Sequence, residues 1–164
     1  MRLHCLRAPT IVFAAALLAG GASSATAQHG RPSSIPDRAR GAERIIVGRI
    51  VRADAIQQVN AHGDQLIVSR AVIQVEESMK GAPIGALQVD VEGGTLNGIT
   101  MNVSDIPTVR AGERAVFFLD RGSAGNYVPH WRGLGIVELD ARSVAQESGL
   151  RLDQIRALVA GAGR

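Results

Sequence analysis

The chain has 164 residues, of which 46% are hydrophobic and one is cysteine, and its formal net charge is +3. This length fits one domain, and the apolar content is too high for a wholly disordered chain. A single cysteine excludes a disulfide framework within the chain and a zinc site built from cysteines.

The N-terminal segment has the three-part pattern of a secretory signal peptide. Arg2 and Arg7 give it a positive start, residues 11–18 form an uncharged apolar run, and an Ala-Thr-Ala sequence ends at Ala27. The apolar run is too short to span a bilayer. We therefore expect cleavage of residues 1–27 after Ala27, a periplasmic or secreted protein, and no integral membrane span once the peptide is gone.

Cleavage changes the charge and the thiol content of the chain. It removes Arg2 and Arg7 from the 18 basic residues and none of the 15 acidic ones, so the mature net charge is +1. Cys5 leaves with the peptide. Because attraction to nucleic acid needs a clustered excess of positive charge, we expect no nucleic-acid partner.

The mature chain begins with a segment of different composition from the rest. Residues 28–42 are rich in Gly, Pro and Ser and are predicted to form a flexible tether. The following pattern is that of strands: residues 44–53 are rich in β-branched side chains, with a bulge expected at Gly48, and residues 65–77 alternate with a period of two. Further strands are expected at residues 87–92, 99–103, 113–120, 127–131 and 135–139.

Turn signals separate these strands, and the chain ends with a helical pattern. Residues 60–64 supply a polar turn, and Asn97-Gly98 is a two-residue hairpin signal. Apolar residues at helical spacing predict a helix at about residues 150–160. Because strands and helices do not alternate, residues 43–164 are predicted to be mainly β, a small, partly open antiparallel barrel with a short C-terminal α-helix.

Several phrases of the sequence carry a family resemblance. Together they cover about residues 44–140 and resemble small exported bacterial domains with the OB-fold barrel of netrin modules and tissue inhibitors of metalloproteinases. The phrases are IIVGRIV at 45–51, VIQVEESMKG at 72–81, GGTLNG at 93–98, VSDIP at 103–107, GERAVFFL at 112–119 and GLGIVELD at 133–140.

The resemblance implies an OB-like barrel and an exported protein partner such as a secreted metalloprotease. The inhibitors chelate catalytic zinc with an N-terminal cysteine, and the mature chain has no cysteine. That mechanism therefore does not carry over to this chain.

Motifs for covalent catalysis and cofactor binding are missing from the sequence. Ser69 and Ser104 lack the Gly-x-Ser-x-Gly elbow, and the glycine pairs do not lead from a strand into a helix as a phosphate loop does. We therefore expect a protein that is not an enzyme and has no cofactor. The candidates for a metal site are His62, Asp64 and His130, and Asp105 and Glu138 could converge with His130.

The aromatic residues define a candidate binding surface. Phe117 and Phe118 are adjacent, so they point to opposite faces and at least one belongs to the core. Tyr127 and Trp131 share one side of their predicted strand and are either both core or both surface. The predicted binding surface consists of Asp105, Tyr127, His130 and Trp131.

Three hypotheses for function follow. The first is an exported, non-enzymatic β-barrel module that binds a protein through its loops and the segment 127–131. The second is a metal-dependent hydrolase or metal carrier using His62, Asp64 and His130. The third, which rests on the resemblance, is an inhibitor or propeptide-like partner of a secreted metalloprotease.

Overall fold

The computed structural model describes residues 34–60, 62–122 and 125–163. The predicted signal peptide and residues 28–33 of the predicted tether lie outside the described residues. Within the described part of the chain, no helix is long and apolar enough to cross a membrane.

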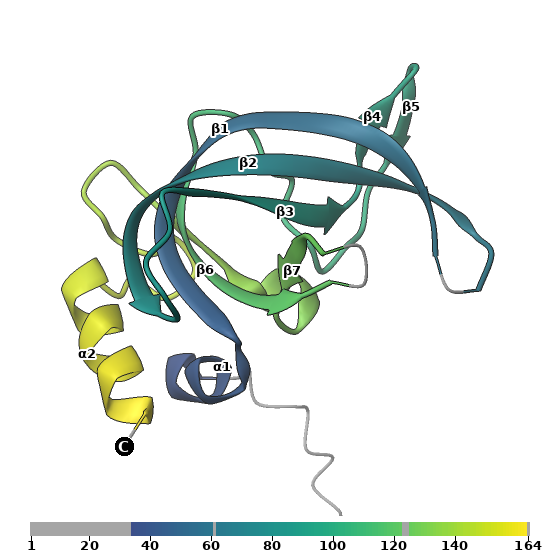
Figure 1. The fold of residues 1–164 in the computed structure, drawn as a ribbon. Coiled ribbons are helices and arrows are strands. Elements are labelled where there is room, and N and C mark those ends of the chain that lie inside the picture. Colours follow the sequence, from purple (N-terminus) through teal and green to yellow (C-terminus); the bar gives the residue numbers. More distant parts are fainter. Residues whose placement is uncertain (1–33, 61, 123–124, 164) are drawn as a thin grey trace, which may run out of the picture.

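The described chain forms a mainly β, OB-like barrel with a helix near each end (Figure 1). The strands pair in the order β1-β2-β3-β7-β6, and β1 also pairs with β6, which closes the ring. All these pairs are antiparallel except β3 with β7, and β8 pairs with β6 beside the ring. In chain order the elements are α1 (Ile35–Gly41), β1 (Arg44–Val59), β2 (Gln65–Lys80), β3 (Ala86–Glu92), β4 (Gly94–Leu96), β5 (Ile99–Met101), β6 (Arg114–Arg121), β7 (Tyr127–Pro129), the 3-10 helix η1 (Arg132–Gly135), β8 (Ile136–Leu139) and α2 (Leu152–Ala162).

The long first strand serves two neighbours because it bends. Its first part, Arg44–Arg49, pairs with β6, while β2 follows it along nearly its whole length. The register between β1 and β2 shifts at Val47/Gly48, which confirms the bulge predicted there. A Cβ on Gly48 would lie 2.5 Å from Ile73 Cγ2 and 2.8 Å from the Gln74 carbonyl oxygen, so the strands approach too closely for a side chain.

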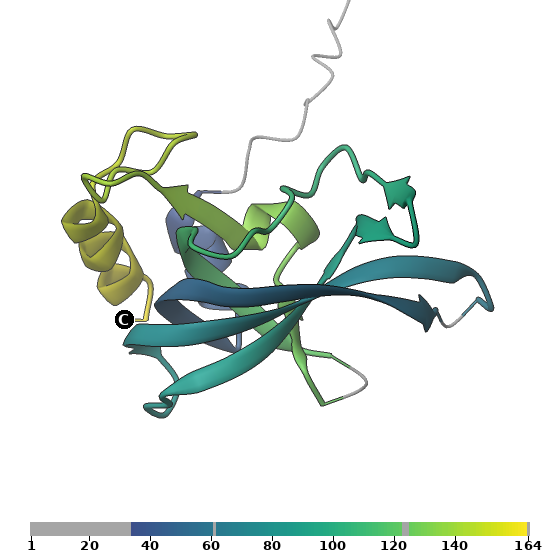
Figure 2. The same ribbon diagram turned by 90° about the horizontal axis from the view of Figure 1, so that it is seen from above.

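The two small strands β4 and β5 form a separate hairpin that projects from the barrel (Figure 2). Asn97 and Gly98 both have positive φ, 51° and 80°, as the predicted two-residue turn requires. The following strand ends at Met101, two residues earlier than predicted.

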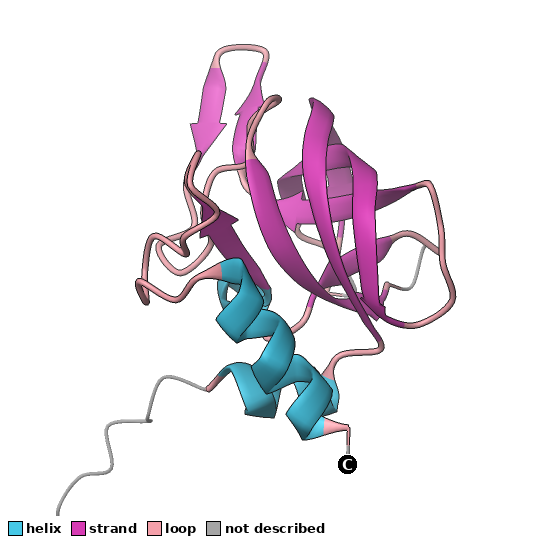
Figure 3. Cartoon of the chain, turned by 90° about the vertical axis from the view of Figure 1, so that its left-hand side faces the viewer, coloured by secondary structure: helices cyan, strands magenta, loops and turns pink. Residues whose placement is uncertain are grey.

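Apolar side chains pack on both faces of the closed sheet. The inner cluster fills the barrel, and the outer cluster includes residues of α1 and α2. Figure 3 shows these two helices together beside the barrel. Phe117 belongs to the inner cluster and Phe118 to the outer one, and both are fully buried. Both members of the pair are therefore core residues.

The prediction of a flexible tether is wrong for residues 35–41, which form α1. Ser34 caps the helix: its hydroxyl accepts from the Asp37 N–H, and the Asp37 side chain accepts from the Ser34 N–H. Ile35 and Ala39 are buried in the outer cluster, so tertiary packing holds a helix of only seven residues. The helix predicted at about residues 150–160 is present as Leu152–Ala162.

The single lysine of the chain fastens α1 to the barrel. Lys80 Nζ donates to the carbonyl oxygens of Ala42 (2.6 Å), Ala39 (2.9 Å) and Arg40 (3.3 Å). These carbonyls have no partner within the helix, and a cation at a helix C-terminus is favourable.

We expect Lys80→Met to lower the free energy of unfolding by about 1–2 kcal/mol, because charge-assisted bonds to partly buried carbonyls are lost. Hydrogen exchange in residues 35–42 should accelerate. Arg52→Met is the control, since Arg52 pairs with exposed Asp54 and an exposed ion pair contributes little. Equal stability of the two variants would contradict this role of Lys80.

Candidate binding site

The segment after β7 leaves the sheet abruptly. Strand β7 ends at Pro129, and Trp131 and Arg132 follow in the left-handed region with φ of 52° and 60°. Such a conformation is costly for a bulky residue and persists only when its surroundings hold it. The alternation assumed for residues 127–131 therefore stops short of Trp131.

The prediction that Tyr127 and Trp131 share one environment is wrong for this reason. Tyr127 is 7% exposed and faces the barrel interior, whereas Trp131 is 48% exposed. The Tyr127 hydroxyl accepts from Arg44 Nε at 3.1 Å and from Arg121 Nη2 at 3.0 Å. Tyr127 therefore joins β1, β6 and β7 and is not part of an exposed surface.

The exposed indole of Trp131 rests on a buried histidine. The rings of His130 and Trp131 stack with 4.5 Å between centroids and 30° between planes. His130 Nδ1 lies 2.7 Å from Asp120 Oδ2, and because a carboxylate only accepts, the ring hydrogen is on Nδ1. The ring of His130 is thereby fixed beneath the indole.

The other ring nitrogen of His130 cannot act on a substrate. His130 Nε2 is buried without a hydrogen-bond partner, and a Cβ on Gly41 would lie 2.5 Å from it. A general base must reach the proton it removes. The His130–Asp120 pair has the composition of a base and its orienting carboxylate, but its basic nitrogen faces the backbone of α1.

Arg132 links the turn to two neighbouring segments. Its guanidinium donates to both carboxylate oxygens of Asp105, at 2.9 and 3.3 Å, and its Nη2 lies 3.2 Å from Glu92 Oε2. The hydrogen bond from Arg132 holds the pKa of Asp105 below its ordinary value. In the following 3-10 helix η1, the Leu134 carbonyl oxygen accepts a hydrogen bond of 2.7 Å from Arg38 of α1.

The structure thus brings three of the four predicted surface residues together. We call Asp105, Asp120, His130, Trp131 and Arg132 the Trp131 platform. Trp131 is the exposed apolar member, His130 and Asp120 support it, and Arg132 with Asp105 forms its polar edge. Arg132 and Asp120 were not singled out from the sequence. The positive φ at residues 131 and 132 places Arg132 here, and the pairing of β6 with β7 brings Asp120 beside His130.

The predicted metal ligands are not assembled. His62 and Asp64 lie in the turn between β1 and β2, at the end of β1 far from α1 (Figure 1). His130 follows β7 and packs against Gly41 of α1. In that turn the Asn60 side-chain oxygen accepts from the His62 and Asp64 N–H groups, the geometry of an ordinary polar turn. Across residues 34–60, 62–122 and 125–163, no group of three or more His, Cys, Asp or Glu side chains is placed to hold a metal ion.

Glu138 lines a surface pocket with Pro107, Ile136, Gln146 and Glu147, and neither His130 nor Asp105 is among the lining residues. In the part of the chain that the structure describes, these three side chains do not form a group that could hold a metal ion. Burial, with neighbouring Glu113 and Glu147, raises the pKa of Glu138 above its ordinary value. The convergence of Glu138 with His130 and Asp105 that the sequence left open as a metal site is therefore not found among the described residues.

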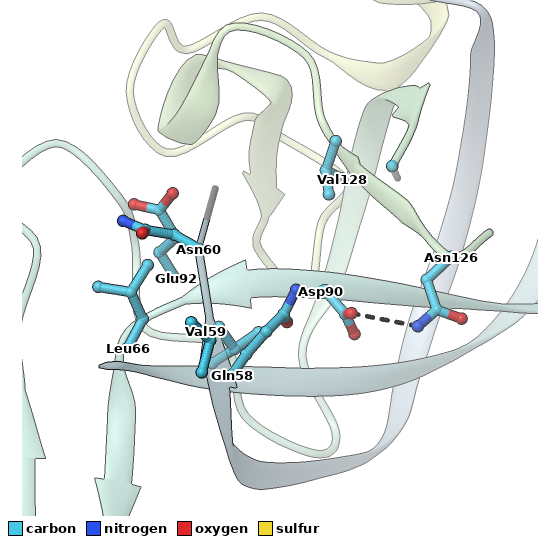
Figure 4. A pocket seen from close by; sticks show the side chains of 10 residues that line it. Gln58, Val59, Asn60, Leu66, Asp90, Glu92, Asn126 and Val128 are labelled. Carbon is cyan, nitrogen blue, oxygen red and sulfur yellow. Dashed lines mark hydrogen bonds between the residues drawn. The ribbon is translucent and has the colours of Figure 1, made fainter. Parts of the chain in front are cut away.

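A second feature, which the sequence did not reveal, is a cavity of about 240 Å³ between the β1–β2 turn and the β6–β7 turn (Figure 4). We call it the hairpin cavity. Its lining residues are Gln58, Val59, Asn60, Leu66, Val68, Asp90, Glu92, Gly122, Asn126 and Val128.

Asp90 is the buried charge of the hairpin cavity. It accepts from Arg70 Nε and Nη2 at 2.8 and 2.9 Å and from Asn126 Nδ2 at 3.1 Å. Burial alone would raise the pKa of Asp90, but the hydrogen bonds from Arg70 and Asn126 outweigh burial and hold the pKa below its ordinary value.

This pKa gives a testable dependence of stability on pH. A lowered folded-state pKa means that Asp90 stabilises the fold fully above its unfolded pKa of about 3.9, and that this contribution is lost as pH falls through the folded value. Asp90→Asn should cost about 1–3 kcal/mol at pH 7, and the difference from wild type should shrink below about pH 4. Denaturant titrations between pH 7 and 2.5 measure this, with exposed Asp54→Asn as control. A gap of unchanged size between pH 4 and pH 2.5 would contradict the assignment.

Comparison with known proteins does not assign the chain to a family. No protein-family model matches the chain, and no curated protein matches it. The resemblance to netrin modules and metalloproteinase inhibitors stays a prediction from the sequence.

Proposed function

We propose that the protein is an exported, non-enzymatic module that binds another protein through the Trp131 platform. The observation that carries the proposal is the half-exposed Trp131, held in a left-handed turn and stacked on a buried histidine. Export rests on the N-terminal signal pattern.

The composition and rigidity of the platform favour a protein partner. Tryptophan and arginine are the residues most enriched among those that dominate binding energy at protein interfaces. A side chain that is already fixed loses less conformational entropy on binding. Trp131 is of a favoured residue type and is already fixed in the free protein. Its ring stacks on His130, and the neighbouring Arg132 is held by its hydrogen bonds to Asp105.

Nucleic acid is a poor fit to the same surface. Base stacking on single strands needs aromatic rings along a positively charged groove. The platform offers one exposed ring, and its one exposed cation, Arg132, already pairs with Asp105 and Glu92. The predicted mature net charge of +1 gives no long-range attraction.

The resemblance makes a secreted metalloprotease the first partner to test, as target of an inhibitor or of a propeptide-like module. Without a cysteine in the mature chain, contact would have to be made by side chains such as Trp131 and not by thiolate on zinc.

Site-specific photocrosslinking in the cell envelope tests the proposal. A photoreactive amino acid at position 131 should give a discrete adduct with one protein, while the same probe at Val51, which is equally exposed on β1, should not. Mass spectrometry identifies the adduct. The absence of an adduct at position 131, or the same adducts from both positions, would overturn the proposal.

A further inference from the structure

Two guanidinium groups converge on one tyrosine hydroxyl where β1 and β7 begin and β6 ends. Arg44 Nε donates to Tyr127 Oη at 3.1 Å, and Arg121 Nη2 donates to the same oxygen at 3.0 Å. Both guanidinium groups also lie over the Tyr127 ring, with Cζ 5.5 and 4.9 Å from the ring centroid. We call Arg44, Arg121 and Tyr127 the Tyr127 cluster.

Arg44 carries a positive charge that no described carboxylate balances. Its Nη1 donates to the Ala82 carbonyl oxygen, and neither this bond nor the bond to Tyr127 brings a negative charge. Across residues 34–60, 62–122 and 125–163, no Asp or Glu forms an ion pair with Arg44. Arg44 is half-buried, and charges taken out of water are normally paired.

Arg121 has one carboxylate partner, and that pair is exposed. Arg121 Nε lies 3.5 Å from Glu43 Oε1, and the two side chains are 55% and 51% exposed. The two arginines together with Glu43 therefore leave one positive charge in excess. Arg44 Nη2 and Arg121 Nη1 have no hydrogen-bond acceptor in the part of the chain that the structure describes, so both can donate to a ligand.

The Tyr127 hydroxyl supplies a third donor. A hydroxyl has one hydrogen and two acceptor lone pairs. The two arginines donate to the oxygen, so its own hydrogen points elsewhere, and the described residues offer no acceptor for it. Three unused donors beside an excess positive charge match an oxyanion.

We infer that the Tyr127 cluster binds a carboxylate. A carboxylate carries the single negative charge that balances the excess, whereas a phosphate dianion would leave a negative excess beside Glu43. Guanidinium groups bind carboxylates through charge-assisted N–H···O bonds. The carboxylate oxygens would accept from Arg44 Nη2, Arg121 Nη1 and the Tyr127 hydroxyl. This binding does not depend on the proposed function.

NMR titrations with small capped compounds test the site. N-acetyl-aspartate methylamide carries a side-chain carboxylate, N-acetyl-alanine carries a C-terminal one, and N-acetyl-asparagine methylamide is the neutral isostere of the first. At least one of the two carboxylates should shift the Nε–H signals of Arg44 and Arg121, and the one that binds more tightly identifies the source. The neutral compound should bind at least about tenfold more weakly than N-acetyl-aspartate methylamide if the side-chain carboxylate is that source.

Two further conditions follow from the charge of the site. The affinity for the carboxylate should fall with added salt, and inorganic phosphate should bind no more tightly than the carboxylate. Tighter binding of phosphate would overturn the assignment to a carboxylate. No shift of either arginine signal with both carboxylates, or a neutral compound that binds as tightly as the better of them, would overturn the site.

Three variants locate the site. Arg121→Gln should weaken carboxylate binding about tenfold, because a charged donor is lost. Tyr127→Phe keeps the buried ring, removes the hydroxyl and should weaken binding by a smaller factor. Glu43→Gln should strengthen binding, because it removes the carboxylate that competes for Arg121. A disturbed fold cannot produce this gain, so unchanged or weaker binding in Glu43→Gln would contradict the site.

Two other variants serve as controls. Arg52→Gln removes an exposed arginine that pairs with Asp54, and carboxylate binding should stay unchanged. Trp131→Ala should also retain carboxylate binding, which separates a failure of this inference from a failure of the proposed function. A loss in Arg52→Gln as large as in Arg121→Gln would show that only the overall charge matters and would overturn the inference.

Discussion

Phe118→Ala is expected to lower the free energy of unfolding by about 4 kcal/mol. Phe118 is fully buried on the outer face of β6, in the cluster that also holds Ile35 of α1 and Ile155 of α2. Removing the ring leaves a cavity between the barrel and both helices. Because His130 packs against Gly41 at the end of α1, loosening this helix should also loosen the support of Trp131.

Denaturant titration and hydrogen exchange separate the two faces of β6. Phe117→Ala should cost a similar amount but act on the barrel interior, so the exchange of α1 and α2 should change most in Phe118→Ala. Leu158→Ala on α2 is the control, since Leu158 is 36% exposed and should cost less than about 1 kcal/mol. A loss in Phe118→Ala as small as in the control would contradict the two-layer core.

Gly133→Ala is expected to cost about 3 kcal/mol and to disturb the Trp131 platform. A Cβ on Gly133 would lie 1.7 Å from the Asp105 carbonyl oxygen and 2.7 Å from its carbonyl carbon. Both atoms are backbone, so η1 and the loop at residues 103–107 must separate. That movement should break the hydrogen bonds from Arg132 to Asp105.

The single tryptophan of the chain reports this change directly. In Gly133→Ala, the fluorescence anisotropy of Trp131 should fall and its quenching by acrylamide should rise. Gly161→Ala is a matched control: nothing lies within 4 Å of its Cβ, it sits in α2, and the same substitution should stabilise by about 0.5–1 kcal/mol. Unchanged stability and anisotropy in Gly133→Ala would contradict the close approach of these segments.

The barrel could be predicted from local sequence patterns. Alternation in residues 65–77 and 87–92, the glycine bulge at Gly48 and the Asn97-Gly98 turn each depend on neighbours in sequence, and the structure confirms them. Helix α1 also had a local signal, Ser34 and Asp37 at capping-box spacing around Pro36, but the surrounding Gly, Pro and Ser residues indicated a tether.

The candidate site could be predicted only in part, because its geometry depends on contacts across the fold. The sequence singled out Asp105, His130 and Trp131 as part of a predicted binding surface. The burial of Tyr127 depends on where β7 ends, and the position of Arg132 depends on a backbone conformation rare for its residue type. The hairpin cavity joins segments as distant as Gln58 and Asn126, which only closure of the barrel brings together.

In the proposed function, Trp131 is the contact residue for a protein partner. Fluorine NMR of protein labelled with 5-fluorotryptophan observes this residue itself, since the one tryptophan of the chain gives one signal. On saturation with the partner identified by crosslinking, the signal should shift, and Trp131→Ala should weaken the complex at least about tenfold while Val51→Ala leaves it unchanged. A saturated complex in which the fluorine signal stays at its free position would show that Trp131 is not in the interface.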